Sequence, residues 1–284
     1  MTTYTKRTLT VDGLLTNVLE QGTGPSVVLL HSGEFGACAE GSWAELIPHL
    51  AADGYHVVAP DWLGFGESDK VVDFADPTGR RIRHMAATIK ALDLGPTAFV
   101  GNSMGGTYLA KAIASTTPLI DAAAAVLVSG GGFVPATEAR DKIQDYDLTE
   151  EGMARILRAV AFHPTLADDS EYVRWRHQLS LAPGSWQCTA SARLRPPGMT
   201  GIGDIGKKDE TDYEQISAPT LIVAGADDPL REPGYADELA RRIPDNELLI
   251  YQECGHLPHL EYPVRFREDL LSFLDRKFRK GLES

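Results

Sequence analysis

Short apolar runs alternate with amphipathic segments along most of this chain of 284 residues. In the first half, mostly apolar runs lie at residues 27–30, 56–59, 98–101 and 122–128, and amphipathic segments lie at 43–52, 82–94 and 104–115. Apolar runs of this length predict strands buried on both faces, whereas apolar residues spaced three or four apart predict helices. The alternation therefore predicts an α/β fold, with a mostly parallel, twisted sheet flanked by helices.

The alternation stops near residue 133 and resumes near residue 214. Between them we find no convincing strand, but amphipathic stretches at 150–161, 170–181 and 185–194, followed by a polar, Pro/Gly-rich stretch at 195–212. Strands are then predicted at 220–224 and 248–251, and helices at 234–242 and 265–278. We therefore predict an α/β core made of residues 1–132 and 214–284, interrupted by a helical lid at 133–213. Long loop insertions cost little closure entropy and often cover active sites.

Composition excludes several classes of partner. The 27 Lys and Arg against 40 Asp and Glu give a formal charge of −13, which disfavours nucleic acids and anionic membrane surfaces. The longest purely apolar run, residues 122–128, is far shorter than the roughly 20 residues that span a bilayer. The N-terminus has no apolar leader, and three scattered cysteines form neither a metal motif nor a disulfide framework. We expect a cytoplasmic protein with no metal and no cofactor.

One sequence motif predicts a catalytic residue. Residues 101–105 read Gly-Asn-Ser-Met-Gly, which fits G-x-S-x-G, and they follow an apolar run directly and precede a helical segment directly. That context predicts a strained strand-to-helix turn with an exposed nucleophilic serine, Ser103. The start of the following helix would supply a backbone donor, the Met104 N–H, for an oxyanion.

A neutral serine needs a general base, and His256 is the candidate. It follows the predicted strand at 248–251, so it should lie at the sheet edge where Ser103 also emerges. His259 is close enough to remain a minor alternative. His31 follows the first apolar run, where we expect it to support the loop rather than transfer protons.

The base needs a carboxylate that orients it. The strand at 220–224 leads into Gly-Ala-Asp-Asp-Pro, and either Asp227 or Asp228 could reach His256. We favour Asp228, the third residue past the glycine. The resulting chain order, Ser103, then Asp228, then His256, is that of the α/β-hydrolases. A second oxyanion donor is expected from the loop at 31–37, with Gly33 as the best candidate.

Two further segments carry a family resemblance. Residues 61–69 read Asp-Trp-Leu-Gly-Phe-Gly-Glu-Ser-Asp, and residues 101–106 read Gly-Asn-Ser-Met-Gly-Gly. With these motifs the chain resembles the α/β-hydrolase fold family, and within it the meta-cleavage-product hydrolases, which split C–C bonds in ring-opened products of aromatic degradation. The resemblance covers nearly the whole chain and includes residues 171–184, which look like the family's lid helix.

The resemblance also implies a substrate site. A lid arginine of the family contacts the substrate's carboxylate or dienol end, and Arg176 matches it; Asn102 matches an asparagine that contributes beside the nucleophile. The residues alone leave Arg176 equally compatible with a solvated surface position. The chain departs from the family at Ser32 and Glu34 in the oxyanion loop, and at Leu257, where a tryptophan is usual. We expect these positions to contact the substrate.

The sequence thus predicts a serine hydrolase acting on a small carbonyl substrate, with C–C bond hydrolysis as the first hypothesis. A carboxylesterase or lactonase with the same triad is the main alternative. A non-catalytic ligand-binding protein on the same fold is a third possibility, because fold and triad do not by themselves prove turnover. The resemblance also suggests a homodimer.

Overall fold

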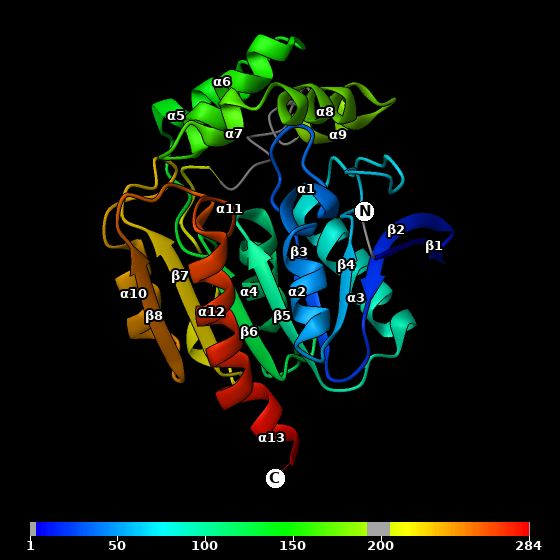
Figure 1. Cartoon of the computed structure of the whole chain (residues 1–284), viewed down its shortest axis with the longest axis vertical. Helices are drawn as coiled ribbons and strands as arrows, with labels where there is room; N and C mark the ends of the chain where they lie inside the picture. The colour runs from blue at the N-terminus through cyan, green and yellow to red at the C-terminus, as the bar shows by residue number, and fades with distance from the viewer. Residues whose placement is uncertain (1–3, 192–204, 284) are drawn as a thin grey trace.

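One sheet forms the centre of the computed structural model, which describes residues 4–191 and 205–283 (Figure 1). The strands are β1 (Thr5–Val11), β2 (Leu14–Gln21), β3 (Ser26–Leu30), β4 (His56–Pro60), β5 (Thr97–Asn102), β6 (Ala124–Val128), β7 (Thr220–Gly225) and β8 (Asn246–Tyr251). Their order across the sheet is β1-β2-β4-β3-β5-β6-β7-β8. Only β1 with β2 and β2 with β4 pair antiparallel; the other neighbours are parallel. The carboxyl ends of β3, β5, β7 and β8 therefore meet at one edge, where open parallel sheets bind ligands.

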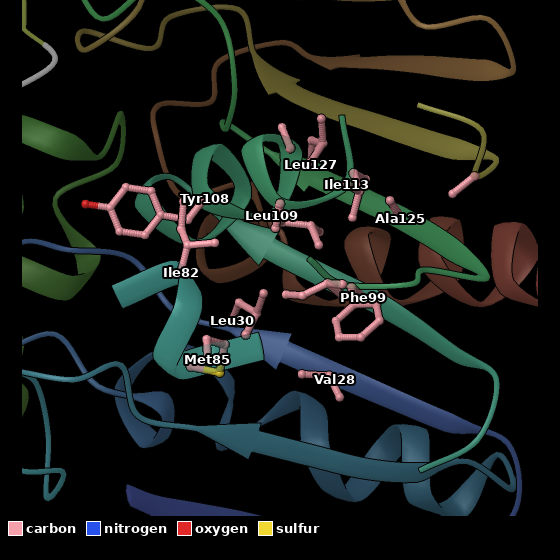
Figure 2. Close-up of a cluster of buried hydrophobic side chains, with 14 of the residues drawn as sticks. Val28, Leu30, Ile82, Met85, Phe99, Tyr108, Leu109, Ile113, Ala125 and Leu127 are labelled. Atoms are coloured by element: carbon pink, nitrogen blue, oxygen red, sulfur yellow. The ribbon is translucent and has the colours of Figure 1, made fainter. Parts of the chain in front are cut away.

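Strand side chains alternate between two cores, one on each face of the sheet. On β3, Val28 and Leu30 join a core with helices α3 (Pro77–Leu92), α4 (Met104–Ile113) and α10 (Tyr235–Arg242). Figure 2 shows part of this core, with Phe99 and Leu127. Val27 and Leu29 of the same strand point into the opposite core, against α1 (Ala39–Trp43), α2 (Leu46–Ala52) and α12 (Pro263–Leu274). All five residues of β3 are buried. Burial on both faces is the physical reason that this strand is apolar without interruption.

The helices of the core flank this sheet. They are α1 (Ala39–Trp43), α2 (Leu46–Ala52), α3 (Pro77–Leu92), α4 (Met104–Ile113), α10 (Tyr235–Arg242), α11 (Pro258–Glu261), α12 (Pro263–Leu274) and α13 (Lys280–Glu283), with a 3₁₀ turn at Tyr213–Gln215 and a π-helical turn at Asp275–Arg279. The inserted helices follow β6: α5 (Glu138–Gln144), α6 (Glu150–Val160), α7 (Thr165–Asp168), α8 (Ser170–Leu181) and α9 (Ser185–Ala190). Figure 1 shows the inserted helices above the carboxyl edge of the strands. They have their own buried cluster, with Met153, Ile156 and Leu157, which also includes Phe35 and Leu257 of the core.

The sheet confirms the predicted α/β class, while several element boundaries differ from those predicted. The segment expected as one helix at 43–52 is two helices, because Pro48 lacks the N–H that would bond the Ala44 carbonyl in a continuous helix. Strands β1 and β2 were not predicted. The side chains of β1 are mostly exposed, so the strand carries no apolar signal. No strand appears within the described part of residues 133–213; the predicted polar stretch at 195–212 falls partly on residues 192–204, outside the described residues.

Neither a membrane span nor a metal cluster is found in the described part of the chain. Within residues 4–191 and 205–283, none of the helices combines the length and the apolar character that crossing a membrane requires. In that same part of the chain, no group of three or more His, Cys, Asp and Glu side chains is arranged to hold a metal ion.

Candidate active site

Ser103 lies on a sharp turn between β5 and α4. Its backbone has φ +53° and ψ −114°, a conformation that L-residues rarely adopt and that costs free energy of order 1–3 kcal/mol. The turn is possible because the chain approaches itself closely: a Cβ on Gly105 would overlap the Leu30 carbonyl oxygen. The Ser103 N–H donates to the Val128 carbonyl at 2.8 Å, which ties the turn to β6.

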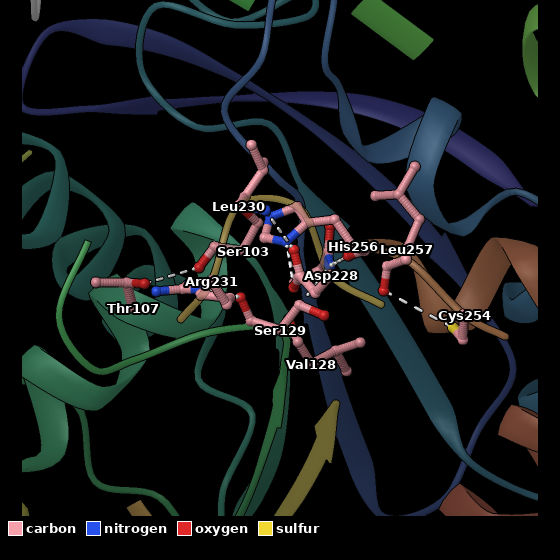
Figure 3. Close-up of polar contacts among 12 residues, drawn as sticks. Ser103, Thr107, Val128, Ser129, Asp228, Leu230, Arg231, Cys254, His256 and Leu257 are labelled. Atoms are coloured by element: carbon pink, nitrogen blue, oxygen red, sulfur yellow. Dashed lines mark hydrogen bonds and ion pairs between the residues drawn. The ribbon is translucent and has the colours of Figure 1, made fainter. Parts of the chain in front are cut away.

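The structure brings Ser103, His256 and Asp228 together as a hydrogen-bonded triad (Figure 3). His256 Nε2 lies 2.6 Å from Ser103 Oγ, and His256 Nδ1 lies 2.7 Å from Asp228 Oδ2. The imidazole is buried, and the backbone N–H of His256 donates to the Val160 carbonyl of α6 at 2.8 Å. The base is therefore held from both sides, by the carboxylate and by an inserted helix.

Asp228 rather than Asp227 faces the imidazole. Asp227 is exposed, whereas Asp228 is buried and also accepts the Leu230 N–H at 2.9 Å. Burial alone would raise the pKa of Asp228, but His256 and the nearby Arg231 guanidinium hold that pKa below its usual range. The carboxylate therefore stays charged where an imidazolium would form, as a triad acid must.

Arg231 supports this arrangement and was not singled out from the sequence. Its guanidinium donates to the Ser129 carbonyl at 2.6 and 3.1 Å and to the Gly131 carbonyl at 2.7 Å. Those carbonyls follow β6, so Arg231 fastens the Asp228 loop to the neighbouring strand (Figure 3). Only its place three residues after Asp228 could have indicated this role, and a lone arginine in a turn is a weak signal.

The two predicted oxyanion donors lie against one another. A Cβ on Gly33 would come 2.5 Å from Met104 Sδ and 3.0 Å from Met104 Cβ. The Met104 N–H belongs to the first turn of α4, where helix N–H groups lack partners within the helix. His31 acts as a support of this loop, since its Nε2 accepts the Trp62 N–H at 3.0 Å and its Nδ1 lies 2.6 Å from the Ser32 carbonyl. These contacts hold Gly33 and Met104 together, and the role of their N–H groups as oxyanion donors stays a prediction.

A cavity of about 200 Å³ opens above Ser103 and His256. Gly33 and Met104 line it, as do the predicted substrate contacts Glu34 and Leu257. Further apolar lining comes from Val134, Ile143, Val160, Ile205 and Leu230. A mostly apolar cavity with a few polar groups is typical of a small-molecule site.

Three of the predicted substrate contacts, Asn102, Ser32 and Arg176, are not among the residues that line this cavity. Asn102 is fully buried, and its Nδ2 donates to the carbonyls of Val128, at 3.2 Å, and His256, at 3.3 Å, so it positions the histidine. Ser32 is buried too, and its hydroxyl bonds the Glu34 carboxylate. His259, which was the minor alternative base and not a predicted substrate contact, packs on Trp43 with ring centroids 4.5 Å apart.

Arg176 is the third, and it is neither solvated nor open to the cavity. Only 2% of its surface is exposed, and its Nη2 donates to Glu34 Oε1 at 2.9 Å and to the Phe35 carbonyl at 3.1 Å. Its Nη1 donates to the Tyr172 hydroxyl at 3.1 Å. In this structure the Arg176 guanidinium is paired with the Glu34 carboxylate, while its Nε has no hydrogen-bond partner among the described residues. The pair joins α8 to the oxyanion loop, and the substrate contact expected of Arg176 stays a prediction.

Breaking this buried ion pair is expected to destabilise the fold. Replacing Glu34 by glutamine should lower the free energy of unfolding by about 3–5 kcal/mol at pH 7, because the Arg176 charge is left buried and unpaired. Urea unfolding followed by tryptophan fluorescence measures this difference. The control is Glu138→Gln, which removes an exposed ion pair with Lys142 and should leave the unfolding midpoint unchanged.

The same variant has a defined pH dependence. Burial alone would raise the pKa of Glu34, but Arg176 and Ser32 lower it below its usual value near 4.5. A lowered pKa contributes stability above the usual value, and this contribution is lost as the pH falls through the lowered one. The difference between wild type and Glu34→Gln should therefore shrink below about pH 4.5. A difference that stays constant in acid would contradict the assignment.

The chain is similar in sequence to several known proteins. A family model described as the alpha/beta hydrolase fold matches residues 26–263. A 2-hydroxy-6-oxo-6-(2'-aminophenyl)hexa-2,4-dienoic acid hydrolase of Metapseudomonas resinovorans is 33% identical over 276 residues, which cover 96% of this chain and 92% of that protein. A 2-hydroxymuconate semialdehyde hydrolase of Pseudomonas putida is 30% identical over 272 residues, covering 94% and 93%.

Two solved structures share this fold over nearly the whole chain. The crystal structure of CarC, a serine hydrolase involved in carbazole degradation, superimposes with a TM-score of 0.81 at 31% identity, covering 96% of this chain and 99% of that one. A meta-cleavage product hydrolase, CumD, superimposes with a TM-score of 0.83 at 25% identity, covering 95% and 98%. The similarity to both extends over the inserted helices as well as the sheet.

Proposed function

The chain belongs to the α/β-hydrolase fold family, and we propose that it hydrolyses a C–C bond in a ring-opened product of aromatic degradation. The protein is an enzyme, a hydrolase of the meta-cleavage-product type. The observation that carries the substrate class is the likeness over almost the whole chain to two hydrolases, one named for a hexa-2,4-dienoic acid and one for 2-hydroxymuconate semialdehyde. The hydrogen-bonded triad of Ser103, His256 and Asp228 supports the nucleophilic mechanism.

The acylation step uses groups already within hydrogen-bond distance. His256 Nε2 takes the proton of Ser103 Oγ as that oxygen attacks the substrate's carbonyl carbon, and Asp228 stabilises the imidazolium. The N–H groups of Gly33 and Met104 hold the resulting oxyanion. Losing one such donor typically costs about 2.7–4 kcal/mol of the barrier, so these donors matter nearly as much as the base.

Cleavage of a C–C bond adds one requirement. The leaving group is a carbon, so the dienol of the substrate must first become a ketone by proton transfer to carbon. The electrons of the broken C–C bond then pass into the conjugated ketone, and the resulting enolate oxygen takes the proton held on His256, which restores the enol. Water, deprotonated by His256, next attacks the acyl group on Ser103 Oγ, which releases the carboxylic acid and restores the serine.

A carboxylesterase or lactonase remains the second candidate. The observation in its favour is that Arg176 and Asn102, which the family resemblance assigns to the substrate, are engaged by groups of the protein itself. The same triad would acylate on an ester with an oxygen leaving group and would need no ketonisation.

We also propose a cytoplasmic location, a small-molecule substrate and a homodimer. Three free, buried cysteines, Cys38, Cys188 and Cys254, support a cytoplasmic location. A small molecule is the substrate, and a homodimer is proposed from the resemblance alone.

A substrate panel tests the proposed reaction. Steady-state rates are compared for 2-hydroxy-6-oxo-6-phenylhexa-2,4-dienoate and for p-nitrophenyl esters of short acids. We expect kcat/KM for the dienoate to exceed that for the esters. If the enzyme hydrolyses the esters but not the dienoate, the C–C assignment is wrong and the carboxylesterase or lactonase function is supported.

A further inference from the structure

The cavity above Ser103 contains a cation with an unfilled donor. Arg140 lies on α5, one of the inserted helices above the carboxyl edge of the sheet (Figure 1), and its side chain lines the cavity. Its Nη2 donates to a neutral acceptor, the Leu230 carbonyl, at 2.9 Å. Its Nε is buried and has no hydrogen-bond partner among the described residues. An unmet guanidinium donor in a partly desolvated cavity costs free energy unless a ligand bonds it.

The other charged groups around this cavity are already engaged. Glu34 is paired with Arg176 at 2.9 Å, and Asp228 with His256 at 2.7 Å. Arg231 lies near Arg140, but its donors are used by the Ser129 and Gly131 carbonyls. Burial, and then the repulsion from Arg231, lower the pKa of Arg140 to about 10, so the side chain keeps its charge at neutral pH.

We propose that Arg140 is the residue that binds the substrate's carboxylate, in place of Arg176. The guanidinium fork matches a carboxylate with two parallel hydrogen bonds, and such charge-assisted bonds are about twice as strong as neutral ones. The ligand class is a small acid with its carboxylate on the α5 side of the cavity and its reacting carbonyl at Ser103 Oγ. This assignment rests on the proposed function for the identity of the natural acid, but not for the presence of a carboxylate site.

The test uses pairs of esters, so that it does not depend on C–C cleavage. Mono-p-nitrophenyl succinate, glutarate and adipate each carry one free carboxylate. The neutral partner of the glutarate is p-nitrophenyl 5-methylhexanoate, which has a methyl pair where the glutarate has its carboxylate oxygens. The measured quantity is the ratio of kcat/KM for the acidic ester to kcat/KM for the neutral one.

In Arg140→Met this ratio is expected to fall by about 10–100-fold for the best acid, mainly through KM, as the loss of a charge-assisted hydrogen bond predicts. Arg140→Lys, which keeps the charge but loses the fork, should lie between. The control is Lys142→Met, an exposed change on the same helix, which should keep the wild-type ratio. Melting curves establish that each variant is folded, and Arg140→Lys keeps the test decisive if the methionine variant does not fold.

Two results would overturn the proposal: an unchanged ratio in both Arg140 variants, or a selective loss in Arg176→Met with the Arg140 variants unaffected. Failure to cleave the dienoate, together with a normal Arg140 effect on the ester pairs, would instead refute only the proposed C–C reaction. The two ideas therefore fail by different measurements.

Discussion

Replacing Ser103 by alanine is expected to lower kcat by on the order of 10⁴–10⁶-fold, with little change in folding stability. The alanine removes the oxygen that forms the acyl intermediate, and members of a triad act as a unit, so one loss removes most of their joint effect. The φ of +53° at this position is strained for either residue, which is why stability should change little. Steady-state turnover and labelling with a fluorophosphonate measure the effect.

The labelling experiment has an internal control. Thr116→Ala removes an exposed hydroxyl group just beyond α4 and should keep both the rate and the label. Label that persists in Ser103→Ala would mean that another residue is the nucleophile. Label that is retained in His256→Ala at the wild-type rate would remove the histidine from the role of base.

Replacing Asp228 by asparagine is expected to lower kcat by about 10⁴-fold, because the amide no longer holds His256 in the tautomer that accepts the serine proton. Asp227→Asn is the matched control, since it changes a neighbouring exposed carboxylate by the same atoms. It should leave kcat within a few-fold of wild type. Rates measured under saturating substrate compare the two, and a larger loss in Asp227→Asn would reverse the assignment.

The three triad residues were predictable because each follows a strand of the parallel part of the sheet. Ser103, Asp228 and His256 come after β5, β7 and β8, and parallel strands end at a common edge, so local patterns alone place the three residues together. The choice between Asp227 and Asp228 was also open to sequence reasoning, from their distance to the glycine that ends the strand.

The substrate side of the site was not predictable in the same way. The pair of Arg176 and Glu34 joins residues 142 positions apart, on an inserted helix and on a loop of the core. Whether an arginine on such a helix faces the cavity, the solvent or an acid below it depends on packing that no local pattern encodes. Arg140 was not predicted because its short helix, α5, has only one buried residue, Ile143, and therefore no strong periodic pattern of apolar residues.

The hairpin of β1 and β2 was missed for another reason, since its contacts are local but β1 carries no apolar pattern. β1 and β2 pair antiparallel at one edge of the sheet, and the polar, largely exposed side chains of β1 leave the register to backbone hydrogen bonds. Gly36 of the oxyanion loop, in contrast, depends on a contact that is distant in sequence. Its φ is +71°, and a Cβ there would overlap the Arg176 carbonyl oxygen, so the loop and α8 require each other.

The central claim is that this enzyme splits a C–C bond through Ser103, and product analysis in ¹⁸O-labelled water tests it most directly. Incubation with 2-hydroxy-6-oxo-6-phenylhexa-2,4-dienoate is predicted to yield benzoate and 2-hydroxypenta-2,4-dienoate in equal amounts, with one labelled oxygen in the benzoate and no products from Ser103→Ala. Recovery of the intact dienoate from a wild-type sample that hydrolyses p-nitrophenyl esters would contradict it.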